Sequence, residues 1–405
     1  MLVDARDRSD RSRFGTNTKT MSKSQGSTEV ITIGSIPGSE SPNPYVRLFY
    51  QALAQHDIVA GPVPVLDDRW MQEHVHQYDG LHIHWPELSW RGSLPGWYRQ
   101  IIPRSAPGSW RFAKLLIAAS RQRQAKDVVR SLEVVKDAGK FIIWTYHNTE
   151  PHDEKGAAAR YGYAKLAALA DLVIAHDEAA AHTFSRRYPG AVEPTIMPPG
   201  NYVGVYPLPR GREEVLLGLG LDPALPVFGC IGRIRKYKGF VEAAKAFQML
   251  DGKAQLIVAG AADDKPTVEQ LRVLARETPS IALIEGFVDD QRFSDLVNAC
   301  TAVLLPYRSV TGSGALLAAL SFGRAVIVSD QPYFRELLKN ELNAGLIIAS
   351  NAPEAMADGV RGFLEIDVSV RNAAAKALAE RYDWQNVVNP VVSRIRALTE
   401  VAASR

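Results

Sequence analysis

A strand-like segment followed by a basic loop carries the strongest chemical pattern in this sequence. The segment PVFGCIG (226–232) reads as a buried strand, and a helical pattern begins near Gly239. Between them lie Arg233 and Lys238, five positions apart, with two more basic residues in the gap. A strand-to-helix turn presents backbone N–H groups, and fixed cations beside it favour a phosphate that gains charge as a bond breaks. A solvated basic turn is the competing interpretation.

A second loop, rich in small residues, has a similar potential. The run Thr311-Gly312-Ser313-Gly314 directly precedes a helical pattern, so its amides can point toward an anion at the helix start. A tight turn that caps the helix explains the same residues without a ligand. Only the first interpretation predicts a phosphate site.

The elements that must position these residues alternate in two series. Short β-branched runs, typical of buried parallel strands, alternate with helical patterns such as 155–169 and 239–250. Predicted strands lie at 29–34, 80–84, 140–146, 171–175 and 194–197, and then at 226–232, 254–260, 281–286, 301–306, 325–329 and 345–349. This βαβ order predicts an α/β fold of two Rossmann-like parallel-sheet domains facing a central cleft.

A Pro- and Gly-rich stretch at 198–226 interrupts the alternation and predicts an interdomain connection. We expect a first domain over 29–205, completed by the helical pattern at 383–405, and a second over 206–382. Residues 1–28 are polar and lack an apolar core, which predicts a disordered tail and not a signal peptide.

The loop GRIRKYKG and the strand AQLIVAG (254–260) resemble the donor site of GT-B fold glycosyltransferases, especially family 4. The resemblance implies that Arg233 and Lys238 bind the diphosphate of a nucleotide-sugar donor. It also implies that the nucleotide base lies against the loop from Gly286 to Val288. Family 4 carries two glutamates eight positions apart, and this sequence has Val310 and Ala318 there. The family's retaining mechanism therefore does not carry over.

Three segments of the first half are similar to bacterial exopolysaccharide glycosyltransferases, including the β-mannosyltransferases of family 94. They are GLHIHWPE (80–87), WTYHNTEPHD (144–153) and PPGNYVGVYP (198–207). The resemblance implies transfer of a hexose with inversion, mannose first and glucose or another second. The donor would be GDP-mannose, with a UDP-sugar as the alternative, and the acceptor a glycan or lipid-linked oligosaccharide.

Polar residues follow the predicted strands of the first half. An inverting transfer needs a carboxylate as general base, and Glu87, Glu150 and Asp153 are the candidates. A charge at a helix start is the alternative for each of them. His147 directly follows a buried strand and is expected to bind a sugar hydroxyl or to orient an acceptor.

The predicted acceptor side includes further residues near strand ends. The first turn approaches acceptor or diphosphate through Gly34, Ser35 and Gly38. Of His82 and His84 on one strand, we expect one to face the core and the other, His84, to face the cleft, and a metal pair is the weaker alternative. The sequence contains no D-x-D, which agrees with a metal-independent site.

The amino-acid composition limits the kinds of partner and compartment that can be expected for the protein. The 405 residues are 46% hydrophobic and 22% charged, as in ordinary globular proteins, and a net charge of +3 gives no reason to expect nucleic acid as a partner. Cys230 and Cys300 lie in apolar surroundings, which predicts buried thiols in a reducing cytosol. No run of 18 apolar residues occurs, so no membrane span is expected.

A basic stretch suggests contact with a membrane surface. From Arg99 to Lys140 there are ten Lys or Arg residues against three acids. Aromatic residues are interleaved with them, namely Trp97, Tyr98, Trp110 and Phe112. Such a surface suits anionic headgroups at the inner face of the plasma membrane and a lipid-linked acceptor. A solvated helix face is the competing interpretation.

The sequence therefore predicts a cytoplasmic hexosyltransferase of exopolysaccharide assembly, with a nucleotide sugar as co-substrate and no other cofactor. The missing glutamate pair leaves a non-catalytic GT-B binding or scaffold protein as the first alternative. A GT-B nucleotide-sugar epimerase is another. A nicotinamide dehydrogenase is disfavoured because no G-x-G-x-x-G follows the first strand.

Overall fold

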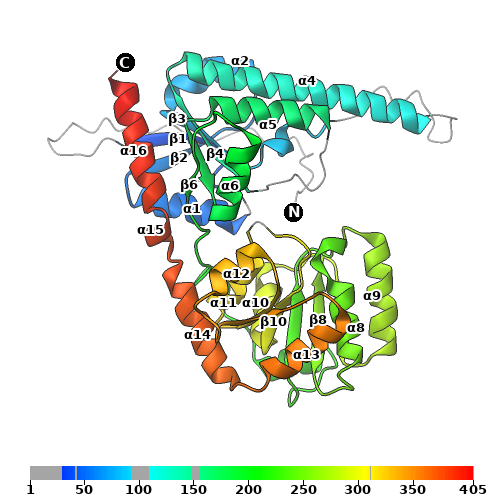
Figure 1. The fold of residues 1–405 in the computed structure, drawn as a ribbon. Coiled ribbons are helices and arrows are strands. Elements are labelled where there is room, and N and C mark those ends of the chain that lie inside the picture. The colour runs from blue at the N-terminus through cyan, green and yellow to red at the C-terminus, as the bar shows by residue number, and fades with distance from the viewer. Residues whose placement is uncertain (1–29, 42, 93–108, 148–155, 311, 405) are drawn as a thin grey trace, which may run out of the picture.

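The computed structural model describes residues 30–41, 43–92, 109–147, 156–310 and 312–404. Their strands form two six-stranded sheets, in which all the paired strands are parallel (Figure 1). The predicted tail at 1–28 lies outside the described residues. The α/β fold with two Rossmann-like halves agrees with the prediction.

The first sheet has the strand order β2-β1-β3-β4-β5-β6. Its strands are β1 (Ile31–Ile36), β2 (Ile58–Pro62), β3 (Gly80–Ile83), β4 (Phe141–Thr145), β5 (Leu172–Ala175) and β6 (Thr195–Ile196). The helical elements between them are α1 (Pro44–Ala54), α2 (Asp68–His74), η1 (Val75–Gln77), η2 (Pro86–Trp90), α4 (Ser109–Asp137), α5 (Ala157–Leu169) and α6 (Glu178–Arg187). The central strands β3, β4 and β5 are buried along their whole length, which explains their continuous apolar runs.

The second sheet has the order β12-β11-β10-β7-β8-β9. Its strands are β7 (Val227–Ile231), β8 (Gln255–Gly260), β9 (Ile281–Glu285), β10 (Ala302–Leu305), β11 (Val326–Ser329) and β12 (Gly345–Ile348). Its helical elements are α7 (Arg212–Gly218), η3 (Lys236–Lys238), α8 (Phe240–Gln248), α9 (Lys265–Glu277), α10 (Asp290–Ala299), α11 (Gly314–Ser321), α12 (Pro332–Leu338), α13 (Pro353–Phe363) and α14 (Val368–Arg381). All six strands predicted for this half are present.

Strand β2 was missing from the sequence prediction. Its five residues include Gly61 and Pro62, and Val59, its second residue, is 37% exposed, because the strand forms an edge of the first sheet. An exposed edge strand lacks the continuous apolar run by which the other strands were recognised.

Each sheet reverses its strand order at one point, where ligands of such sheets bind. In the first sheet this point lies between β1 and β3, and in the second it lies between β7 and β10. The loop containing Arg233 and Lys238 directly follows β7, and His84 directly follows β3. Both groups of predicted site residues therefore lie at the reversal points.

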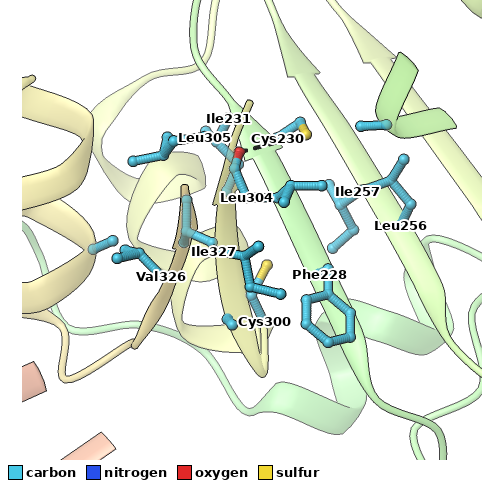
Figure 2. Close-up of a cluster of buried hydrophobic side chains, with 14 of the residues drawn as sticks. Phe228, Cys230, Ile231, Leu256, Ile257, Cys300, Leu304, Leu305, Val326 and Ile327 are labelled. Atoms are coloured by element: carbon cyan, nitrogen blue, oxygen red, sulfur yellow. Dashed lines mark hydrogen bonds between the residues drawn. The ribbon is translucent and has the colours of Figure 1, made fainter. Parts of the chain in front are cut away.

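The second domain has a continuous apolar core that includes both cysteines. Figure 2 shows Cys230 on β7 and Cys300 after α10 among Phe228, Leu304 and Ile327. Both thiols are buried, their Sγ atoms contact the carbonyls of Leu304 and Leu296, and burial raises the pKa of each thiol. They are packing residues, as expected from their neighbours in the sequence.

The chain passes between the domains twice, and the two passages are bonded together. After α14 the chain returns to the first domain as α15 (Trp384–Val387) and α16 (Asn389–Ala403) (Figure 1). Helix α15 contacts α1, and α16 packs beside β4, β5 and β6. Asn201 on the outward passage donates from its backbone N–H to Tyr382 O at 2.7 Å and from its side chain to Ala379 O at 2.9 Å. Trp384 Nε1 donates to Asn201 O at 2.8 Å.

Trp384, Val388 and Val391 of the second passage lie in one apolar cluster with residues of the first sheet. The assignment of 383–405 to the first domain and the domain boundaries stay predictions. Trp384 packs at a ring-centroid distance of 5.4 Å from Tyr45, the second residue of α1. None of the helices in the described ranges is long and apolar enough to cross a membrane.

Candidate functional site

The basic loop after β7 is held in place by the neighbouring loop after β8. Ile234 forms an isolated parallel bridge with Ala262, and Gly232 N donates to Ala259 O at 2.8 Å. A Cβ atom at Gly260 would lie 1.9 Å from Gly232 O, so only glycine permits this close approach of the two loops. The loop is therefore a fixed part of the sheet edge.

Lys238 lies at the end of η3 with its ammonium group directed back over the end of β7. Its Nζ atom lies 2.9 Å from the position of a Cβ at Gly232 and 5.1 Å from the ring centroid of Tyr307. No described residue forms an ion pair with this ammonium group. Burial, followed by the charge of Arg235, lowers the pKa of Lys238 to about 8. A desolvated cation without a counter-ion is suited to bind an anion.

Arg233 and Arg235 share one carboxylate, that of Asp263 on the loop after β8. Arg233 donates to it from Nε at 2.6 Å and from Nη2 at 2.5 Å, and Arg235 donates from Nε at 2.8 Å. The hydrogen bonds from Arg233 are the main reason that the pKa of Asp263 falls to about 2. The Arg233 side chain is half-exposed, so it lies at the surface of the loop.

The Gly-rich turn opens α11, as the sequence predicted for a helix cap or an anion site. Ser313 is buried, and its Oγ accepts a hydrogen bond from Leu316 N at 3.1 Å. A Cβ at Gly312 would lie 3.7 Å from His176 of the first domain, and one at Gly314 would lie 3.1 Å from the Tyr202 hydroxyl. Thr311 lies outside the described residues.

The predicted base loop follows β9. Gly286 is exposed, has φ +116°, and donates from its backbone N–H to Gly260 O at 3.1 Å. Val288 is half-buried and packs on the core of the second domain. Between them Phe287 exposes 55% of its surface. The loop from Gly286 to Val288 is therefore hydrogen-bonded to Gly260, the residue at which the loop after β8 approaches the loop that contains Arg233.

Four histidines, named here the histidine cluster (His82, His84, His147 and His176), line the end of the first sheet. His176 Nδ1 lies 3.0 Å from Met197 O, its Nε2 lies 3.1 Å from His147 Nδ1, and His147 Nε2 lies 3.3 Å from His84 Nδ1. Burial lowers the pKa of each of the four imidazoles, so they are neutral at pH 7.

The Met197 carbonyl assigns the protons along this chain, because a carbonyl only accepts. His176 donates to Met197, His147 donates to His176, and His84 donates to His147. This leaves a bare Nε2 lone pair on His84, and that buried atom has no hydrogen-bond partner within the described ranges. Both ring nitrogens of His147 are engaged with neighbouring histidines, and its predicted contact with a sugar hydroxyl stays a prediction.

The expectation that His82 and His84 point to different sides was wrong. Their ring centroids lie 4.1 Å apart and both side chains are buried, because residues two apart on a strand share a face. His82 Nδ1 lies 2.7 Å from the Tyr50 hydroxyl oxygen, and its Nε2 lies 2.8 Å from Thr145 Oγ1. No group of three or more metal-type ligands occurs in the part of the chain that the structure describes.

Of the three candidate carboxylates, only Glu87 lies within the described residues. It is half-buried at the start of η2, and its Oε2 accepts a hydrogen bond from the Tyr163 hydroxyl at 2.8 Å. Glu150 and Asp153 lie outside the described residues. The structure therefore leaves all three as candidates.

The predicted acceptor residues of the first turn have different environments. Gly34 and Ser35 are buried inside β1, where a Cβ at Gly34 would lie 2.8 Å from Val63, and Ser35 Oγ donates to Pro37 O at 2.7 Å. Gly38 is half-buried in the turn after β1. A packing role accounts for Gly34 without any ligand.

Sequence reasoning missed Asp263 and His176. Asp263 stands in an ordinary polar turn, and only the bridge between two loops brings it to Arg233. The position of His176 could have identified it, because it directly follows β5. His84 directly follows β3 in the same way, and His147 closely follows β4. Residues after neighbouring parallel strands meet at one edge of the sheet.

Two Rossmann-like domains with a cationic loop at the reversal point of the second sheet define the GT-B class of fold. Residues 217–381, most of the second domain, match the family of glycosyl transferases group 1. The solved structure of HepE from Anabaena in complex with UDP and glucose aligns with a TM-score of 0.63 at 14% identity, covering 91% of this chain and all of that one.

Curated relatives are distant and mostly partial. The GDP-mannose:glycolipid 4-beta-D-mannosyltransferase of Xanthomonas campestris pv. campestris is 24% identical over 70% of this chain and 69% of its own length. The lipopolysaccharide core biosynthesis mannosyltransferase LpsB of Rhizobium meliloti is 29% identical over 42% of this chain and 50% of its own. The chain spans only 37% to 48% of the length of the first curated relatives it matches.

Proposed function

We propose that the protein is a glycosyltransferase that moves a hexose from a nucleotide-diphosphate sugar to a hydroxyl of an acceptor. The observation that carries this proposal is Lys238, a partly buried cation without a counter-ion among the described residues, at the reversal point of the second sheet. As the bond from the sugar to the diphosphate breaks, charge grows on the leaving oxygen, and a fixed cation stabilises that charge.

Removal of the donor-loop cations tests the diphosphate assignment. Lys238→Ala and Arg233→Ala should each lower turnover by at least a hundredfold, equivalent to about 2.7 kcal/mol or more, while the thermal midpoint stays within a few degrees. Release of nucleoside diphosphate from GDP-mannose, UDP-glucose and ADP-glucose measures turnover. Lys245→Ala on the exposed side of α8 is the matched control. Wild-type-like turnover in the Lys238 variant would reject the assignment.

We favour mannose from GDP-mannose as the donor sugar, and glucose from a UDP-sugar second. The support for mannose is the similarity to the Xanthomonas and Rhizobium proteins, whose names state mannosyl transfer. The support for a UDP-sugar is the fold shared with HepE, solved with UDP-glucose. A thermal-shift panel separates them, since a ligand at 100 times its dissociation constant adds about 2.7 kcal/mol of stability.

The finer parts of the proposal concern the acceptor and the stereochemistry. We infer a glycan or lipid-linked acceptor in exopolysaccharide assembly, with inversion of a family 94-like type and Glu87, Glu150 or Asp153 as general base. The Xanthomonas relative, named for a 4-beta linkage to a glycolipid, supports this inference. NMR of the product's anomeric proton distinguishes inversion from retention, and a retained configuration would remove the need for a base.

A non-catalytic nucleotide-binding protein is the second candidate. Ala318, at one of the two positions where family 4 has a glutamate, is buried inside α11, and Val310, at the other, packs on the domain core. Neither side chain can accept a hydrogen bond from a ribose or sugar hydroxyl. Nucleotide binding without sugar transfer or donor hydrolysis would favour this candidate.

A further inference from the structure

The ammonium group of Lys238 lies beside two aromatic rings. Its Nζ atom is 5.1 Å from the ring centroid of Tyr307 and 5.8 Å from that of Phe240, the first residue of α8. Both aromatic side chains are buried. A cation within about 6 Å of a ring centroid is attracted by the negative face of the ring, and the attraction is stronger where water is excluded. The rings therefore hold this cation without a carboxylate.

The loop after β10 holds Tyr307 against η3. Arg308 N donates to Tyr237 O, inside η3, at 2.8 Å. Gly239 ends η3 with φ +68°, and a Cβ there would lie 2.3 Å from Pro306 O. Both neighbours of Tyr307 in the chain therefore contact the short helix that carries the ammonium group.

Tyr307 acts on Lys238 through the face of its ring and not as a counter-ion. Burial raises the pKa of the Tyr307 phenol well above its ordinary range, so the phenol is neutral at pH 7. Its buried hydroxyl lies near Ser313 but has no hydrogen-bond partner within the described residues. Replacement by phenylalanine would therefore keep the contact with Lys238.

A ring and a carboxylate differ in what they leave for a ligand. A carboxylate holds a cation and cancels its charge, whereas a neutral ring attracts the cation and adds no net charge. The charged and titratable groups that act on Lys238 are Arg235 and Arg233 on its own loop, Cys230 on β7 and Asp263 on the loop after β8. Asp263 is bonded to the two arginines and forms no ion pair with Lys238.

We propose that Tyr307 is a positioning residue, whose ring holds the Lys238 ammonium group at the end of β7 and leaves its charge for the leaving diphosphate. The inference rests on the proposed function, because it concerns the same cation. A lysine side chain has a flexible four-carbon stem, so without the ring it would turn toward solvent. Transition-state stabilisation needs the cation at the place where charge develops.

Two replacements of Tyr307 separate the ring from the rest of the side chain. Tyr307→Phe keeps the ring face and should retain kcat within about twofold, whereas Tyr307→Leu removes it and should lower kcat about tenfold. Release of nucleoside diphosphate from GDP-mannose and UDP-glucose measures kcat. Phe247→Leu is the matched control, since Phe247 is fully buried in the same core beside Phe228. It should lower the thermal midpoint and keep kcat.

The pH dependence of nucleotide affinity is a measurement that a merely structural role would not change. Wild-type affinity for GDP and UDP, measured by isothermal titration calorimetry, should fall as the pH rises through about 8, the pKa of Lys238. Because the ring stabilises the charged form, this fall should begin about one pH unit lower in Tyr307→Leu. Tyr307→Phe and Phe247→Leu should keep the wild-type pH dependence. Phe240→Leu, which removes the second ring, serves if Tyr307→Leu folds poorly.

The outcomes separate this inference from the proposed function. If Tyr307→Leu keeps wild-type kcat and pH dependence, or if Tyr307→Phe loses as much turnover as Tyr307→Leu, the ring face does not position Lys238. A lower thermal midpoint in Tyr307→Leu with unchanged pH dependence assigns a structural role and also overturns the inference. If the wild type neither binds GDP or UDP nor transfers a sugar, the proposed function itself fails, and the inference fails with it.

Discussion

Single residues of this molecule differ in how their charge is compensated. Arg233 and Arg235 are paired through Asp263, whereas Lys238 is held over Tyr307 and forms no ion pair with any described residue. In the first domain, the four histidines are buried beside one another, and no carboxylate within the described residues is among their hydrogen-bond partners. A buried imidazole in these surroundings stays neutral because its charged form would be desolvated and unpaired.

The histidine cluster predicts loss of stability in mild acid. Burial lowers the pKa of each imidazole below its ordinary 6.5, and that of His82 to about 3, so the unfolded chain binds protons that the folded chain does not. Stability should be full above pH 6.5 and fall as the pH drops below it, with His82 contributing about 1.4 kcal/mol per pH unit and the other three histidines adding in the same direction. Urea unfolding between pH 7.5 and 5 measures this slope.

A histidine variant checks the origin of the slope. His82→Leu removes one titrating group, so its stability at pH 7 should be lower but should vary less with pH than that of the wild type. His182→Gln on the exposed side of α6 is the control and should keep the wild-type slope. An unchanged slope in His82→Leu would contradict the explanation.

At the scale of elements, the sequence predicted a strand correctly where every residue of that strand is buried. Strands β4, β7 and β8 are buried at every position, and their apolar runs predicted them directly. The edge strand β2 was missed because half-exposed residues and Pro62 mask its pattern. The candidate site residues after β3, β4 and β7 were proposed by the same logic, and the structure places them at those strand ends, while their function stays a prediction. Asp263 was not, since its contact with Arg233 depends on two loops meeting in space.

Helix α4 contains most of the basic stretch for which the sequence predicts contact with a membrane surface. Its second half packs through residues such as Val128 and Leu132, whereas its first half extends beyond α5 (Figure 1). Residues 109–126 contain five basic residues and no acid, and Phe112 and Leu115 are 44% and 68% exposed. We propose that this combination of apolar and basic residues contacts an anionic lipid surface, and a solvated helix face stays the alternative.

Vesicle binding tests this role of α4. Arg123→Gln and Lys126→Gln should each weaken binding to phosphatidylglycerol vesicles about fivefold, since a basic residue near such a surface contributes about 1 kcal/mol. Leu115→Ser should weaken it further, whereas Leu342→Ser, 77% exposed on the second domain, should not. Co-sedimentation with phosphatidylglycerol and with phosphatidylcholine vesicles measures the difference. Equal binding of both lipids by the wild type would contradict the proposal.

At the scale of the whole molecule, the junction between the domains depends on one close approach. A Cβ at Gly200 would lie 2.3 Å from the indole of Trp384, so any side chain there pushes the two interdomain passages apart. Gly200→Ala should destabilise the protein by about 1–3 kcal/mol through overpacking. Gly211→Ala, in the same connection but with open space around it and φ −57°, should be tolerated. Urea unfolding of both variants measures the contrast.

The bonds that join Asn201 to Ala379, Tyr382 and Trp384 have a mechanical consequence. Two polypeptide segments fastened at a single place permit rotation about that place but resist sliding of one lobe past the other. The axis of any opening motion should therefore pass near Asn201. Such a rotation would separate Gly312 from His176, which face each other across the lobes so closely that a Cβ at Gly312 would lie 3.7 Å from the imidazole, and would leave each sheet internally unchanged.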